Sequence, residues 1–154
     1  MHPPSVVLFT ICDLPLLPLY GAFDPPSLAL ALDGIPTFDR SVLVSDEELG
    51  NQLVEAMQGQ PACLMRGHGI ATAGGSVEQA TLTAIALNRL AEMNERAHRL
   101  GAPRPISDQD QDVFRRFRSR THPGAEVSTH QPAAAGSSRL AVSWRYYCRL
   151  VGED

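Results

Sequence analysis

The stretch ACLMRGHGIATAGGS, residues 62–76, decides the fold that we predict. Two short apolar runs, 62–65 and 70–73, flank the sequence Arg66-Gly67-His68-Gly69. Short apolar runs bounded by glycine are typical of buried strands, and glycine beside a histidine lets the backbone turn tightly. We therefore predict two β segments joined by a turn that carries His68 at its apex.

A long helix is predicted directly after these strands. Ser76 and Gln79 have the Ser-x-x-Gln spacing of a capping box, and the helix is expected to span 76–100 because Gly101 and Pro103 follow. Its apolar residues form a broad stripe along one side. The pattern therefore predicts a central helix that packs on the sheet.

Shorter elements complete the prediction. The spacing Ser45-x-x-Glu48 predicts a second capping box and a helix of about thirteen residues. A strand is expected near 35–44, and the patterns favour further helices at 5–12, 27–32, 108–117 and 140–151. We therefore predict an α/β layered domain with a mainly antiparallel sheet flanked by helices.

Domain organisation follows from length and composition. The chain has 154 residues, of which 44% are hydrophobic and 19% charged, as expected for one globular domain. We assign 1–120 and 139–154 to this domain. The segment 121–138 is rich in Ala, Ser, Gly, Pro and Thr and is predicted to be a flexible loop.

The basic residues narrow the chemistry. All 13 are arginine, so the chain contains no lysine. This excludes a lysine Schiff base, pyridoxal phosphate on a lysine and a P-loop lysine. Any carbon–carbon bond chemistry here needs another electrophile.

Charge and cysteine usage indicate the compartment and the partners. The formal net charge is −4, which argues against nucleic acid as a partner despite the arginine cluster at 115–120. Three scattered cysteines without Cys-x-x-Cys spacing indicate a reducing compartment, so we expect a cytoplasmic protein. The apolar stretch at 6–12 is too short to span a membrane.

Two histidines carry the strongest functional signal. His2 precedes Pro3-Pro4, and His68 lies between two glycines. Together with the long helix at 74–100, the sequences Met1-His2-Pro3-Pro4 and Arg66-Gly67-His68-Gly69 resemble the class II aldolase/adducin family. Its metal site consists of a His-x-His-Pro segment and a later Gly-His-Gly turn.

The resemblance implies a three-layer fold, and it implies that His2 and His68 bind a divalent metal ion. Zinc is expected first, with manganese, cobalt or iron as alternatives. The ion would withdraw electrons as a carbon–carbon bond breaks, in place of a Schiff base. Arg66 would bind a substrate carboxylate, or it forms a surface ion pair. Tyr146 and Tyr147 resemble family tyrosines that reach a neighbouring subunit's site and donate a proton.

The loop at 19–24 and the tail Trp144-Arg145-Tyr146-Tyr147 resemble the branch of the family that acts on aromatic hydroxy-carboxylates. We therefore expect a metal-dependent lyase for a small-molecule substrate, either a decarboxylase or an aldolase. The resemblance also implies a homo-oligomer, a tetramer. The alternative is a non-catalytic interaction protein like the adducins.

The family's first metal-binding histidine and its acidic residue would precede Met1, so the chain is expected to be truncated at its N-terminus. We predict little lyase activity for the 154-residue chain, because a catalytic metal site usually has three protein ligands. An upstream-extended form should be active with Zn²⁺, Mn²⁺ or Co²⁺. Release of CO₂ or aldehyde measures this. Robust, His68-dependent turnover by the short chain would contradict the prediction.

Overall fold

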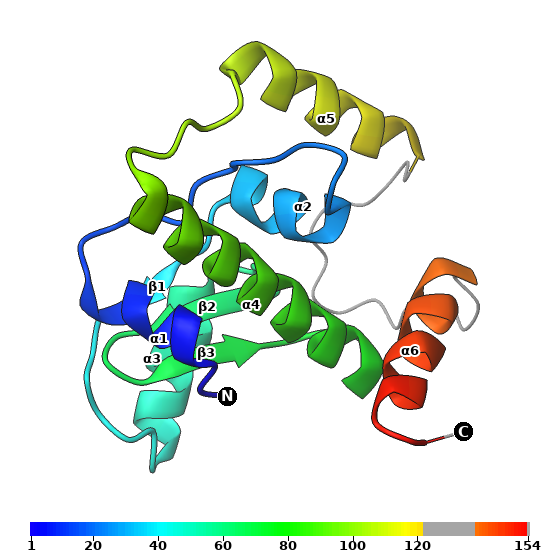
Figure 1. Cartoon of the computed structure of the whole chain (residues 1–154). Helices are drawn as coiled ribbons and strands as arrows, with labels where there is room; N and C mark the ends of the chain where they lie inside the picture. Colours follow the sequence, from blue (N-terminus) through cyan, green and yellow to red (C-terminus); the bar gives the residue numbers. More distant parts are fainter. Residues whose placement is uncertain (122–137, 154) are drawn as a thin grey trace.

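A three-stranded sheet lies at the centre of the computed structural model, which describes residues 1–121 and 138–153. The strands β1 (Thr37–Phe38), β2 (Ala62–Met65) and β3 (Gly69–Thr72) are arranged in the order β1-β2-β3 (Figure 1). Strands β2 and β3 are antiparallel, with Met65 opposite Gly69, whereas β1 pairs parallel to β2. The two β segments predicted around His68 are confirmed, and the sheet of the described residues is mixed.

The strand predicted near 35–44 is much shorter than expected. Only Thr37 and Phe38 pair with β2, and the Phe38 carbonyl accepts the last hydrogen bond from the Arg66 amide at 3.1 Å. Because β2 ends at the turn that begins with Arg66, the chain beyond Phe38 has no strand to pair with. The prediction failed here because a strand's length is set by its partner.

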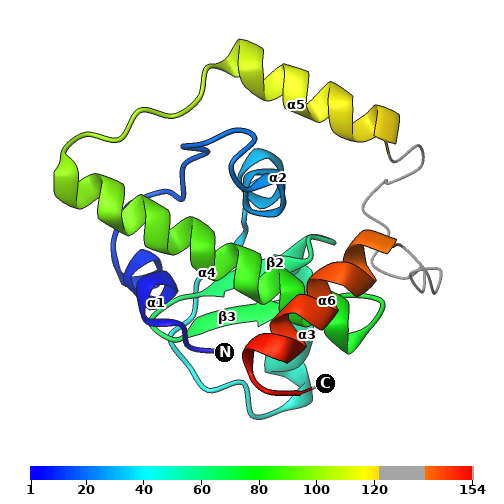
Figure 2. The ribbon, with the colours of Figure 1, turned by 45° about the vertical axis from the view of Figure 1, so that its right-hand side comes forward.

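Helices cover both faces of the sheet (Figures 1 and 2). Ala62 and Leu64 of β2 belong to the hydrophobic cluster that includes α1 (Pro4–Ile11) and α4 (Val77–Leu100). The intervening Cys63 and Met65 belong to a second cluster, with α3 (Glu47–Met57). Since neighbouring side chains of a strand point to opposite faces, the domain has three layers, as expected. Helix α2 (Pro25–Asp33) packs on α4.

The helix starts confirm one capping prediction and correct another. The Ser76 hydroxyl accepts the Gln79 amide at 3.3 Å, so α4 begins as predicted. Helix α3 is capped by Asp46, whose carboxylate accepts the Leu49 amide at 2.9 Å, and the prediction that Ser45 caps it was wrong. The two residues are adjacent, and both types are good caps, so spacing to Glu48 alone did not separate them.

Two helices lie at the periphery. Helix α5 (Asp108–Thr121) contacts α2, and its Arg118 forms an ion pair with Asp33 at 2.6 Å. Helix α6 (Ser138–Leu150) packs against α4. The flexible loop predicted at 121–138 falls, for residues 122–137, outside the described part of the chain. Among the helices of residues 1–121 and 138–153, none has the length and apolarity needed to cross a membrane.

Asn94 of α4 is hydrogen-bonded to the segment that follows α1. Its side chain is fully buried; the amide oxygen accepts the Leu17 N–H at 2.9 Å, and the amide nitrogen donates to the Leu17 carbonyl at 3.1 Å. The Asn94 amide thus makes the two hydrogen bonds that a neighbouring strand would otherwise make to the backbone of Leu17. Its loss would leave both backbone groups of Leu17 without these partners.

We predict that Asn94→Ala lowers the free energy of unfolding by about 2–4 kcal/mol, because buried polar groups lose their partners. Urea denaturation measures this. The matched control is Asn88→Ala on the same helix, where the half-buried amide donates to Glu92 at 2.9 Å. The control should lose less than about 1 kcal/mol. Equal losses in the two variants would contradict the role of Asn94.

Candidate metal centre

The turn between β2 and β3 positions His68. The His68 N–H donates to the Met65 carbonyl at 3.0 Å, and Gly67 has a φ of +64°. Gly67 is the third of the four turn residues 65–68, and among these it is the one with a positive φ. This is the pattern of a type II turn, in which glycine is favoured at the third position. The Gly67 amide also donates to the Thr10 carbonyl at 3.3 Å, which ties the turn to α1. His68 is therefore held on an ordered turn, half-buried at the end of the sheet.

The first residue of the chain pairs with the outer edge of β3. The Met1 amino group donates to the Ile70 carbonyl at 2.9 Å, and the Ile70 amide donates to the Met1 carbonyl at 2.9 Å. Gly69 makes this approach possible, because a Cβ there would overlap the Met1 carbonyl oxygen, and its φ is +155°. The reciprocal pair fixes the position of His2, the next residue.

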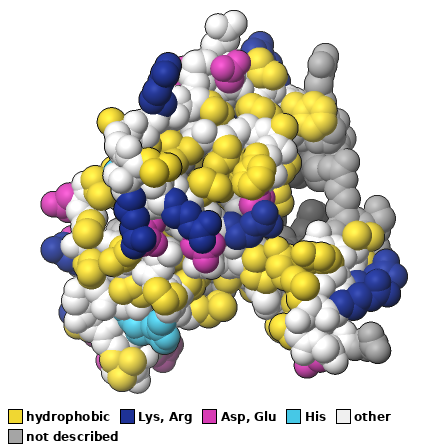
Figure 3. Space-filling model, viewed as in Figure 1, with side chains coloured by type: hydrophobic (Ala, Val, Ile, Leu, Met, Phe, Trp, Pro, Cys, Tyr) yellow, Lys and Arg dark blue, Asp and Glu magenta, His cyan; other side chains and the backbone are white. Residues whose placement is uncertain are grey.

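His2 and His68 come together as a consequence. Their rings are stacked, with centroids 4.8 Å apart and planes 19° apart. Figure 3 shows histidine side chains exposed as a patch on the face seen in Figure 1. The family resemblance implied this approach of two histidines that lie 66 positions apart in the chain.

The pair fits a metal ion in donor type, because imidazole nitrogen is a common zinc ligand. Metal–nitrogen bonds are about 2.1 Å long, so two nitrogens on one tetrahedral ion lie about 3.4 Å apart. The rings are stacked in nearly parallel planes, so both would have to rotate about their side-chain torsions before their nitrogens face one ion. Within residues 1–121 and 138–153, no group of three or more His, Cys, Asp or Glu side chains is placed to hold an ion. The described residues therefore bring two candidate ligands together, whereas a catalytic zinc site usually has three protein ligands.

Arg66 is engaged by an acidic neighbour. Its guanidinium lies 2.6 Å from the Asp39 carboxylate, and both side chains are exposed. The hydrogen bond that Arg66 donates to the Asp39 carboxylate raises the pKa of Arg66, so the side chain is a cation at any physiological pH. Arg66 lines a cleft of about 490 Å³ together with Asp13 and Thr37, and neither His2 nor His68 lines this cleft.

The two tyrosines lie elsewhere in the chain. Tyr147 is half-buried, and its hydroxyl accepts a hydrogen bond from Arg89 at 3.3 Å, whereas Tyr146 is 58% exposed. Figure 1 shows α6, which carries both tyrosines, apart from the N-terminus. Within one chain, the structure thus brings together His2 and His68 but not the tyrosines.

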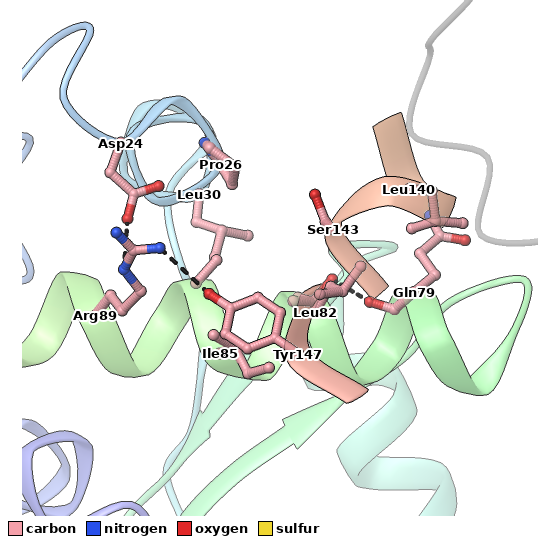
Figure 4. Close-up of a pocket in the computed structure, with 12 residues that line it drawn as sticks. Asp24, Pro26, Leu30, Gln79, Leu82, Ile85, Arg89, Leu140, Ser143 and Tyr147 are labelled. Carbon is pink, nitrogen blue, oxygen red and sulfur yellow. Dashed lines mark hydrogen bonds and ion pairs between the residues drawn. The ribbon is translucent and has the colours of Figure 1, made fainter. Parts of the chain in front are cut away.

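A polar cluster around Arg89 was not predicted from the sequence. Asp24 caps α2; its side chain is only 4% exposed, and its carboxylate lies 3.0 Å from the Arg89 Nε (Figure 4). Partial burial lowers the pKa of Arg89, but the contacts with Tyr147 and Asp24 outweigh this effect. The pKa of Arg89 is therefore raised above its usual value. The signal was an arginine that continues the apolar spacing of Leu82 and Ile85 on the long helix.

Comparison with known proteins places the chain in a family. Residues 1–94 match the family described as Class II Aldolase and Adducin N-terminal domain. The chain belongs to this family, and the resemblance found in the sequence is confirmed. The L-fuculose 1-phosphate aldolase from Glaciozyma antarctica PI12 has the same fold, with a TM-score of 0.60 and 15% identity over 97% of this chain and 51% of that one.

More similar relatives are decarboxylases. A 3,4-dihydroxyphthalate decarboxylase from Arthrobacter keyseri is 41% identical over 94% of this chain and 52% of its own length. One from Rhodococcus jostii (strain RHA1) is 42% identical over 61% of this chain and 39% of its own length. The chain thus spans about half the length, or less, of these curated relatives.

We predict that Gly69→Ala separates the two histidines, because the added methyl group displaces Met1 and strains a positive φ. Nuclear Overhauser contacts between the rings of His2 and His68 should disappear, and stability should fall by about 1–3 kcal/mol. The control is Gly50→Ala, where a Cβ meets nothing within 4 Å. Ring contacts that survive in Gly69→Ala would contradict the role of the Met1 pairing.

Proposed function

We propose that this protein is a divalent-metal-dependent carboxy-lyase for an aromatic hydroxy-carboxylate such as 3,4-dihydroxyphthalate. The observation that carries the proposal is the stacked pair of His2 and His68, 4.8 Å apart between ring centroids, within the residues 1–94 that match the family. The names of the decarboxylase relatives support the substrate class. The absence of lysine agrees with a mechanism that needs no Schiff base.

His2 and His68 would hold the ion, with at least one further ligand from outside the described residues. When bound, a divalent ion supplies a Lewis acid that accepts electron density from the ring as the carboxylate carbon leaves. Zinc is our first choice, with manganese, cobalt and iron as alternatives. The reaction breaks the bond between ring and carboxylate; CO₂ leaves, and a proton takes its place on the ring carbon.

Arg66 is the cation nearest in sequence to His68, and we assign it to a second carboxylate of the substrate. Its ion pair with Asp39 is exposed on both sides, so exchange of one carboxylate for another costs little. Arginine can meet a carboxylate with two parallel hydrogen bonds. The ion pair with Asp39 supports this assignment, because it shows that the Arg66 side chain can bind a carboxylate.

A proton donor is assigned to α6 of a neighbouring subunit. Tyr146 and Tyr147 are the candidates, and Tyr146 is the more exposed of the two, at 58%. A homo-oligomer, a tetramer by family resemblance, would carry α6 of one chain to the histidines of the next. Exposed apolar side chains near α1, such as Ile11 at 62%, support association.

Two other functions are less well supported. An aldolase would use the same metal site, and the fold relative that cleaves a sugar phosphate shares only 15% identity with this chain. A non-catalytic role of the adducin kind would not require the histidines to meet. Because the more similar relatives carry the name of a decarboxylase, we favour the carboxy-lyase.

We predict that His2→Ala and His68→Ala each weaken Zn²⁺ affinity by at least about tenfold, because each removes one of two ligands. Isothermal titration measures this, with Cys12→Ser as the background because Cys12 is exposed. His98→Gln is the control; His98 contacts the Asn94 carbonyl at 2.8 Å and lies outside the pair. In an upstream-extended form, His68→Ala should also abolish CO₂ release from 3,4-dihydroxyphthalate.

Zn²⁺ affinity that falls equally in His98→Gln, or that is unchanged in both alanine variants, would contradict the metal site. Binding that behaves as predicted without His68-dependent CO₂ release would keep the metal site and overturn the decarboxylase.

A further inference from the structure

A second pocket lies on the side of α4 that faces away from the sheet. Ala84, Leu87 and Ala91 of α4 belong to the core beneath the helix. Leu82, Ile85 and Arg89, on the other side, line a pocket of about 370 Å³ beneath α2 and beside α6 (Figure 4). This volume falls in the range of small-molecule sites, and neither His2 nor His68 is part of the lining.

Hydrogen-bond donors gather at one end of this pocket. The Arg89 Nε lies 3.0 Å from the Asp24 carboxylate, and its Nη1 donates to the Tyr147 hydroxyl at 3.3 Å. A guanidinium has further N–H groups beyond the two used in these contacts, and a phenol that accepts a hydrogen bond keeps its own hydrogen to donate. This end therefore presents donors rather than acceptors.

Asp24 does not cancel this preference. Its carboxylate is 4% exposed and accepts from the Ser27 hydroxyl at 2.9 Å and the Ser27 amide at 3.4 Å, besides its contact with Arg89. These contacts use its oxygens within the protein. Arg89, by contrast, has a side chain that is 48% exposed at the pocket. A ligand that enters meets the guanidinium and the phenol.

The rest of the lining is largely apolar. Leu30, Leu82 and Ile85 form walls around the Arg89 end, and Figure 4 shows Leu30 extending from α2 toward α4, where the Tyr147 ring lies. A flat apolar body fits such walls, and an anionic acceptor fits the donor end. A highly charged phosphate would place more negative charge next to Asp24 than a carboxylate does.

We propose that this pocket binds a small aromatic monocarboxylate, with its carboxylate against Arg89 and Tyr147 and its ring between Leu30, Leu82 and Ile85. The site is separate from the histidine pair and needs no metal. It joins α2, α4 and α6, so its occupant would bring α6 and α2 to α4 and stabilise the fold by binding the native state alone.

The test is titration of the 154-residue chain with benzoate in the presence of EDTA. Benzoate should bind at least about tenfold more tightly than benzyl alcohol, which has the same ring without the charge. Arg89→Gln should weaken benzoate binding at least about tenfold and Tyr147→Phe about three- to tenfold. Arg99→Gln, the same substitution on the same helix at an ion pair with Glu95 outside the pocket, should change nothing.

Arg89→Gln removes the cation next to buried Asp24 and could unfold the chain, so Ile85→Trp is the second variant. The larger ring fills the pocket and should abolish binding while Arg89 keeps its contacts. Binding that is absent up to about 10 mM benzoate would overturn the site, because such affinity is weaker than a specific carboxylate contact gives. So would binding unchanged in both Tyr147→Phe and Ile85→Trp.

His68→Ala separates this proposal from the proposed function. It should leave benzoate binding unchanged, because His68 does not line the pocket. If His68→Ala removes benzoate binding, the ligand sits at the histidines and the second site is overturned. If Zn²⁺ binding fails while benzoate still responds to Tyr147→Phe, the metal centre is wrong and the second site stands.

Discussion

The reciprocal hydrogen bonding between Met1 and Ile70 is the constraint on which the candidate site depends. Two hydrogen bonds of 2.9 Å place the first residue on the edge of β3, and Gly69 leaves room for the Met1 carbonyl oxygen. His2 is thereby carried to the turn on which His68 stands. Without this pairing, an exposed residue at the start of the chain would have no fixed position relative to the sheet.

A second set of polar contacts fixes the outer helices. Asp24 caps α2 and holds Arg89 of α4, which in turn binds Tyr147 of α6. One arginine of α4 thus contacts both α2 and α6. The histidine pair and this arginine lie on different sides of the long helix, so the domain has two places where polar side chains converge. We propose a metal ion for the first and an organic anion for the second.

Local patterns predicted the elements that local physics determines. The turn around His68 and the start of α4 at Ser76 were predicted from glycine and capping signals, which act within a few residues. The parallel pairing of β1, its short length and the ion pair of Asp24 with Arg89 could not be predicted in this way. These features depend on contacts between residues that are distant in sequence, and composition does not show which residues are in contact.

In the candidate site, too, some features were predicted from the sequence and others were not. The approach of His2 to His68 followed from the family resemblance, whereas the contacts that hold them, Met1 on Ile70 and the clearance at Gly69, became visible only in three dimensions. For Arg66, the sequence left two alternatives, a contact with a substrate carboxylate and a surface ion pair. The structure shows the ion pair with Asp39.

X-ray absorption at the zinc edge shows whether His2 and His68 bind a metal ion, because it reports the atoms bonded to the ion whatever the activity. For the 154-residue chain loaded with one equivalent of Zn²⁺, we predict two imidazole nitrogens at about 2.0–2.1 Å, with oxygen donors completing the shell. In His68→Ala the spectrum should lose one imidazole. A wild-type spectrum with sulfur ligands, or with no imidazole scattering, would contradict a metal centre built on His2 and His68.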